Sequence, residues 1–121
     1  MALSIINSGT YLPNCIGTWT TLKVDNSEGL KQFKIDMTNL PPGTIMVLSF
    51  QTKLGPDQPF LEFDSSAISI PVTIPAGPSQ GHQPVANFEF NSISFGFQVQ
   101  AQIINGTLPS KGLYWALCVI H

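Results

Sequence analysis

The chain alternates between hydrophobic and polar residues with a period of two along most of its length. The clearest run is ISFGFQVQAQII, residues 93–104, where every second residue from Ile93 to Ile103 is apolar. The opposite face carries Gln98, Gln100 and Gln102. This alternation predicts a half-buried β-strand, with its apolar face in a core and its glutamine face toward water or a partner.

The same pattern predicts about eight strands in all. TIMVLSFQT is apolar on both faces, which is typical of a central strand, whereas Pro71 lacks a backbone donor and predicts an edge strand or a bulge. The other runs are SIIN near the start, GTWTTLKV, LKQFKIDM, AISIPVTIP, ANFEF and LYWALCVI.

Turn-forming residues separate these runs, and helical periodicity is nearly absent. They include Pro41-Pro42-Gly43 and Asn105-Gly106, and the Asn-Gly pair favours a two-residue hairpin turn. Short, evenly spaced strands of this kind predict one all-β domain over residues 1–121. The expected architecture is a two-sheet antiparallel β-sandwich, either jelly-roll or immunoglobulin-like.

The closing run LYWALCVI is apolar on both faces. Every second residue from Leu113 to Val119 belongs to one apolar stripe, and every second residue from Tyr114 to Ile120 belongs to the other. We therefore expect this strand inside the sandwich, with His121 close to a subunit contact. The stretch SKGLYWALCVI is similar to the Gly-x-Tyr strand of immunoglobulin-like sandwiches, which implies a corner position for Tyr114. Cys118 falls four residues after this tyrosine, not two as in the immunoglobulin pattern.

Charged residues make up only 10% of the chain, compared with about 25% in an average domain. The five basic residues are all lysines and the formal net charge is −2, which argues against nucleic acid as a partner. No apolar stretch is long enough to span a membrane. A sparsely charged surface favours burial against other protein subunits, although a sparsely charged monomer is the simpler alternative.

The chain has two cysteines, Cys15 and Cys118. A disulfide between the first and last strands and a pair of buried free thiols both fit, and we favour the thiols. The first residues lack the basic region of a signal peptide, so we expect synthesis in the cytoplasm. The final location that we expect is a virion.

The long irregular stretch Pro75–Asn87 is either a functional loop or an excursion without a role. It contains Gly77-Pro78-Ser79-Gln80-Gly81, which matches the nucleophile elbow of hydrolases. No helix pattern follows, so we predict no catalytic residue and no enzyme. Cys118 and His121 are three apart, which places them on opposite faces of a strand and argues against a metal site.

The sequence also contains residues that suit two other kinds of binding site. Asp57, Glu62 and Asp64 are carboxylates beside a turn that could bind calcium, although solvated surface carboxylates are the ordinary explanation. Aromatic side chains beside polar groups could bind a sugar, although aromatic residues in strands usually belong to the core. The aromatic candidates are Tyr11, Trp19, Tyr114 and Trp115.

The leading hypothesis is a non-enzymatic structural or binding module of a symmetric assembly, such as a capsid decoration or tail component of a phage or virus. Its expected partners are copies of itself and a larger protein assembly, without cofactor, metal, nucleic acid or membrane. The alternative is a lectin-like carbohydrate-binding domain, with Tyr11, Asp57, Glu62 and Asp64 as its sugar or calcium site. The candidate interface residues are Pro75, Pro78, His82, Gln98, Gln100, Gln102 and His121.

Overall fold

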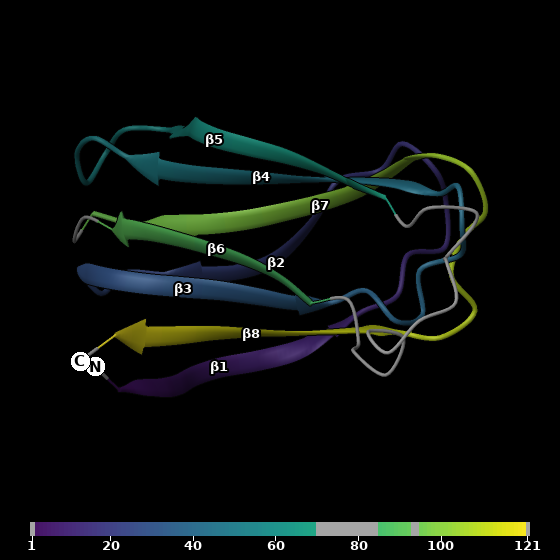
Figure 1. Ribbon diagram of the computed structural model, residues 1–121. Helices are drawn as coiled ribbons and strands as arrows, with labels where there is room; N and C mark the ends of the chain where they lie inside the picture. The colour runs from purple at the N-terminus through teal and green to yellow at the C-terminus, as the bar shows by residue number, and fades with distance from the viewer. Residues whose placement is uncertain (1, 70–84, 93–94, 121) are drawn as a thin grey trace.

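A computed structural model describes residues 2–69, 85–92 and 95–120 of the chain. It contains eight β-strands arranged in two layers (Figure 1). Among the described residues, no helix is long and apolar enough to cross a membrane. The strands are β1 (Leu3–Tyr11), β2 (Thr20–Asp25), β3 (Gly29–Asp36), β4 (Ile45–Lys53), β5 (Phe60–Ser69), β6 (Val85–Ser92), β7 (Phe97–Asn105) and β8 (Leu113–Ile120).

The strands form two four-stranded antiparallel sheets with the orders β1-β8-β3-β6 and β2-β7-β4-β5. Each strand of the first half pairs with one of the second half, β1 with β8, β2 with β7, β3 with β6 and β4 with β5. This nested pairing is a long antiparallel ribbon wrapped into two sheets, which is the jelly-roll arrangement. The predicted β-sandwich is therefore confirmed. Because the immunoglobulin order pairs the first strand with the second, the jelly roll is the alternative that applies.

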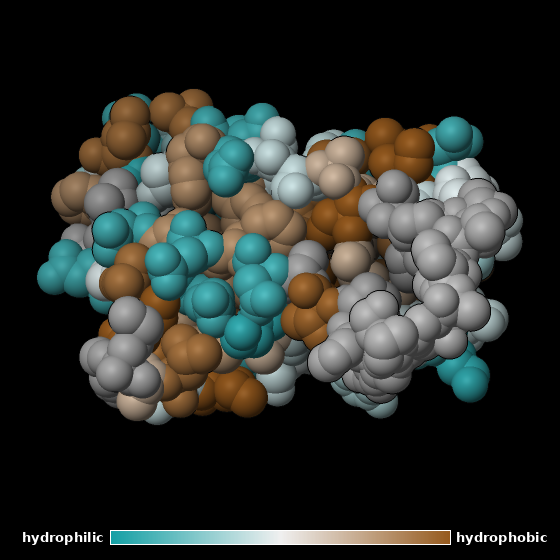
Figure 2. Space-filling view, viewed as in Figure 1, coloured by the Kyte–Doolittle hydropathy of each residue, from teal (hydrophilic) through white to brown (hydrophobic). Residues whose placement is uncertain are grey.

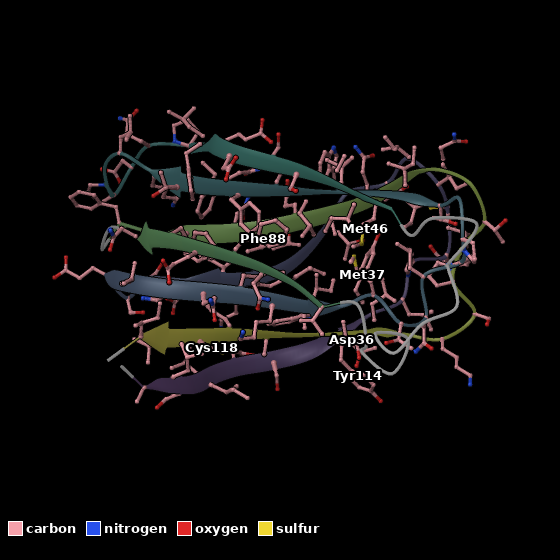
Figure 3. All side chains as sticks on the ribbon, in the orientation of Figure 1. Asp36, Met37, Met46, Phe88, Tyr114 and Cys118 are labelled. Carbon is pink, nitrogen blue, oxygen red and sulfur yellow. The ribbon has the colours of Figure 1, made fainter. Side chains whose placement is uncertain are left out.

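The hydrophobic core lies between the two sheets and is built from the apolar stripes of the strands. Aromatic rings occupy its centre: Phe33 stacks on Trp115 with 5.9 Å between ring centroids, and Phe90 stacks on Phe97 at 4.2 Å. Figure 3 shows Phe88, Met37 and Met46 in the space between the sheets. The fully buried residues include Phe33, Ile35, Met46, Leu48, Phe97, Val99, Ala101, Ile103, Leu113 and Leu117.

The strands predicted to be central are central. β8 pairs with both β1 and β3, and β4 pairs with both β5 and β7. In β8 the inward stripe of Leu113, Trp115 and Leu117 is buried, as the alternation predicts. β5 lies at the edge of its sheet, but it shares only residues 67–69 with the predicted run AISIPVTIP. Pro71, the rest of that run and His121 lie outside the described residues.

The prediction of a hairpin turn at Asn105-Gly106 is wrong. β7 ends at Asn105, but β8 belongs to the other sheet, so the connection crosses the sandwich. Gly106 has a φ of 98°, and a Cβ there would lie 2.6 Å from the Cα of Thr44. The hydroxyl of Thr44 donates to the Thr107 carbonyl at 2.9 Å and accepts from its N–H at 3.1 Å. Glycine is thus required here for close packing of two loops.

Two predicted boundaries also need correction. The strand expected over residues 93–104 begins only at Phe97, because Gly96 has a φ of 141° and interrupts the extended conformation. The irregular stretch expected to reach Asn87 ends earlier, because β6 begins at Val85 and pairs with β3 from there.

Both cysteines are free, and their environments differ. Cys118 is buried, as expected for a small apolar side chain. Cys15 is exposed and its sulfur lies 3.0 Å from the hydroxyl of Thr18. The expectation of two buried thiols is therefore wrong for Cys15, which lies in the connection between β1 and β2.

Candidate functional site

A hollow of about 470 Å³ lies on the outer face of the β1-β8-β3-β6 sheet. Its residues come from all four strands of that sheet, so strands distant in sequence build one surface. Figure 3 shows Asp36 and Tyr114 close together toward the same end of the sheet. The lining residues are Ser8, Gly9, Thr10, Lys34, Asp36, Val85, Tyr114, Trp115 and Ala116.

The strand alternation positions these side chains. In β3, Phe33 and Ile35 point into the core, so Lys34 and Asp36 project from the outer face. In β8, Trp115 is buried, and its neighbour Tyr114 is 67% exposed. The antiparallel register places Thr10 of β1 opposite Tyr114.

Gly9 closes the packing beneath the hollow. It lies opposite Trp115 in the register of β1 and β8, and a Cβ on Gly9 would lie 2.7 Å from Cζ2 of the indole. Any larger residue would have to displace this ring. The sequence thus pairs a glycine with a tryptophan across two strands, which keeps the indole against the sheet.

The hollow carries one positive and one negative side chain, and each is held by a neighbour. The ammonium of Lys34 donates to Oδ1 of Asn87 at 2.6 Å. Oδ1 of Asp36 accepts hydrogen bonds from the backbone N–H and the hydroxyl of Thr38 at 2.9 and 2.6 Å. The described lining is therefore balanced in charge but mostly apolar in surface, and the exposed ring of Tyr114 is its aromatic component.

The outer face of the other sheet carries a network of amide side chains. Gln98 donates to Gln51 at 2.7 Å, and Gln51 donates to Gln100 at 2.9 Å and to Ser49 at 3.0 Å. The hydroxyl of Ser49 donates to the carboxylate of Glu62 at 2.6 Å. The network crosses three strands and satisfies many of its own donors and acceptors.

Exposed apolar side chains gather on β1, the edge strand next to β8. Leu3 is 46% exposed, Ile5 67% and Ile6 42%. The register shifts between Ile5 and Asn7, which marks a β-bulge at Ile6. In Figure 2, hydrophobic side chains are visible along the lower margin of the molecule, where Figure 1 shows β1.

The structure separates the predicted aromatic candidates into two groups. Tyr11 and Trp115 belong to the core, at 1% and 7% exposure, so the ring of Tyr11 is not available to a sugar. Trp19 and Tyr114 are exposed. Tyr114 lies on the face of a central strand and not at a corner, unlike the tyrosine of the immunoglobulin pattern.

The predicted carboxylate group does not assemble. Glu62 is bonded to Ser49, Oδ1 of Asp64 accepts from the N–H of Ser65 at 2.9 Å, and Asp57 lies in the turn between β4 and β5. Within the part of the chain that the structure describes, no three His, Cys, Asp or Glu side chains are grouped to hold a metal ion.

The predicted glutamines lie on one strand, and the other predicted interface residues cannot be placed. Gln98, Gln100 and Gln102 are part-buried along β7, where they alternate with buried residues as expected. Their role in an interface stays a prediction. Pro75, Pro78, Ser79, His82 and His121 lie outside the described residues.

Sequence reasoning missed Ser8, Thr10, Lys34 and Asp36 as members of one site. The alternation within LKQFKIDM does place Lys34 and Asp36 on one polar face. Nothing in the local sequence indicates that β8 lies between β3 and β1, which is the order that brings these residues to one surface.

The fold and these surfaces define a small jelly-roll domain with a hollow on one sheet, an amide network on the other and an uncharged edge strand that exposes apolar side chains. Comparisons with protein-family models, with curated proteins and with solved structures found no match.

Proposed function

We propose that this protein is a non-enzymatic structural module that acts in a symmetric assembly of identical chains, joined through β1. The observation that carries this proposal is the character of the β1 edge, which is uncharged and exposes apolar side chains. The concrete setting that we propose is a phage or virus particle, as a capsid decoration or tail component, because jelly rolls are a common architecture of capsid proteins.

β1 differs from the other three edge strands. β2 carries Lys23 and Asp25, β5 carries Glu62 and Asp64, and β6 carries Glu89. Charges on an edge strand oppose pairing with another chain. The nine residues of β1, LSIINSGTY, include no charged residue and no proline. β1 therefore lacks the side chains with which proteins usually protect a sheet edge.

An uncharged edge is suited to contact with a second copy of itself. In a two-fold symmetric contact both subunits use the same patch, so a charged side chain near the symmetry axis would lie opposite the same charge of the second subunit. Antiparallel β1 strands would avoid this repulsion and would cover Leu3, Ile5 and Ile6 of both copies. Burial of apolar area of this kind is the main favourable contribution in protein association.

The rest of the surface is compatible with further contacts. Charged residues are 10% of the chain, and the amide network on the β2-β7-β4-β5 sheet satisfies many of its own hydrogen-bonding groups. Such a face can be covered by another subunit at a small desolvation cost. Repeated weak contacts through several surfaces would hold an assembly together by avidity.

The test is the oligomeric state of the full chain, measured by light scattering and sedimentation from micromolar to millimolar concentration. We expect the wild-type protein to associate and Ile5→Lys to shift it toward the monomer. Leu54→Lys is the matched control, because Leu54 is 66% exposed and Ile5 67%, but Leu54 lies in the turn after β4. A wild-type protein that stays monomeric throughout, or equal effects of the two variants, would overturn the proposal.

The particle setting has a test of its own. Immunogold electron microscopy with antibodies against this protein would examine particles purified from cultures of the source organism. Label on intact particles would support the virion role. Protein found only outside the particles would contradict the virion role and leave the self-association to the first experiment.

A further inference from the structure

Tyr114 is the most exposed aromatic side chain among the described residues, at 67%, compared with 42–45% for Trp19, Phe63 and Phe95. It stands on β8, between β1 and β3, and thus away from the edges of its sheet. Buried tyrosine rings contribute through their large apolar area, and Tyr114 leaves most of that area in water. Its ring is available as a flat surface for a ligand.

The groups around this ring can both donate and accept hydrogen bonds. Ser8 and Thr10 contribute hydroxyls from β1, Lys34 contributes an ammonium group and Asp36 a carboxylate. The volume of about 470 Å³ lies within the range of small-molecule sites, which is about 300–1,000 Å³.

The balance of charge narrows the class of ligand. Among the described residues, Lys34 is the only cation that lines the hollow, and it is bonded to Asn87. The carboxylate of Asp36 lines the same space. A phosphate or nucleic acid requires several cations, so this lining disfavours an anion. A purely apolar ligand would remove water from the ammonium of Lys34 and the carboxylate of Asp36 and leave them only their bonds to Asn87 and Thr38.

We infer that the hollow is a binding site for a neutral saccharide. The apolar C–H face of a sugar ring lies on the ring of Tyr114, whose π face carries partial negative charge. The sugar hydroxyls bond to Ser8, Thr10, Lys34 and Asp36. Each sugar hydroxyl both donates and accepts, which matches a lining that mixes an ammonium group, a carboxylate and hydroxyls.

The test starts with the wild-type protein on a glycan array that carries neutral, sialylated and sulfated saccharides. Saturation-transfer NMR with the neutral monosaccharides and disaccharides follows at millimolar concentration. We expect neutral saccharides to bind and Tyr114→Ala to weaken their affinity by about tenfold or more. Tyr114→Phe keeps the ring and is expected to lose less.

Trp19→Ala is the control, because it removes an exposed aromatic ring that does not line the hollow. Circular dichroism of both alanine variants checks that they are folded. Loss of binding in the Tyr114 variant alone supports the site. No binding by the wild-type protein, binding restricted to anionic glycans, or equal affinity of Tyr114→Ala and wild type would overturn it.

This inference does not depend on the proposed assembly. The hollow lies on the face of the sheet and reaches β1 only at residues 8–10, whereas the proposed subunit contact runs along the edge of β1 and covers Leu3, Ile5 and Ile6. We expect Ile5→Lys to bind saccharide and Tyr114→Ala to associate like the wild type. A monomeric protein that binds saccharide would overturn the assembly alone, and an assembled protein that binds none would overturn the saccharide site alone.

Discussion

Replacing Tyr11 by phenylalanine removes one buried oxygen atom and leaves an aromatic ring in the core. Tyr11 is 1% exposed, and its hydroxyl has no hydrogen-bond partner among the described residues. A buried polar group without a partner costs about 1–3 kcal/mol. We therefore expect Tyr11→Phe to raise the free energy of unfolding near neutral pH by about 1 kcal/mol, whereas most substitutions in a core lower it.

The same hydroxyl makes the stability sensitive to alkaline pH. Burial, with a smaller electrostatic contribution from Cys15, raises the pKa of Tyr11 from 10.0 to about 12. The folded protein thus keeps this proton to a higher pH than the unfolded chain. The corresponding stability is complete below the unfolded pKa of 10.0 and is lost as the pH approaches 12. The loss amounts to about 3 kcal/mol.

The assay is urea unfolding, followed by tryptophan fluorescence at a series of pH values from neutral to strongly alkaline. The difference in stability between wild type and Tyr11→Phe isolates the contribution of this tyrosine, because all other side chains are common to both proteins. Tyr114→Phe is the control, because this exposed hydroxyl should change stability little. The reasoning is refuted if Tyr11→Phe is less stable than wild type near neutral pH, or if both proteins lose the same stability in alkali.

Two further substitutions test the packing. Gly106→Ala should cost about 3 kcal/mol or more, because it adds a Cβ 2.6 Å from the Cα of Thr44 to the strain of a φ of 98°. Gly17→Ala is its control, because Gly17 has a φ of 87° but nothing lies within 4 Å of the added Cβ. Urea unfolding should show that Gly17→Ala lowers the free energy of unfolding by about 1 kcal/mol. Equal losses in the two variants would contradict the role of the contact with Thr44. Lys31→Met should destabilise by about 1–2 kcal/mol, because the buried ammonium donates to two backbone carbonyls at 3.1 and 3.3 Å and lies 3.6 Å from Asp25. A Lys31→Met protein as stable as the wild type in thermal unfolding would show that these contacts contribute nothing net.

The strands with the strictest alternation were predicted best. In β7 the apolar residues from Phe97 to Ile103 recur at every second position and are all buried, and in β3 Phe33 and Ile35 are buried in the same stripe as Lys31. β8 is apolar on both faces, and its stripe from Leu113 to Leu117 is buried. The pattern works because a strand has only two faces, and burial of one face imposes a period of two. β1 was predicted only as the short segment SIIN, because its second half mixes Asn7, Ser8 and Gly9 and gains its order from β8.

The candidate site was predictable only in its parts. Tyr114 and the glutamines of β7 were identified as candidates, but the hollow combines residues 8–10, 34–36, 85 and 114–116. These segments meet because β8 lies between β1 and β3. The Asn105-Gly106 turn was misread for a related reason: the local preference for a hairpin yields to a chain path that crosses to the other sheet.

The sequence by itself determined the all-β class, the approximate number of strands and which face of the alternating strands is buried, because these properties depend on neighbours one or two positions away. It did not show that Tyr11 and Lys31 are buried. Only the tertiary structure decided which strands are adjacent, and thereby the hollow beside Tyr114 and the exposed β1 edge. Alternation makes every strand apolar on one side and says nothing about its neighbours along the sheet. That choice depends on pairing between residues as far apart as Leu3 and Ile120, where the energy of the whole sandwich selects the order.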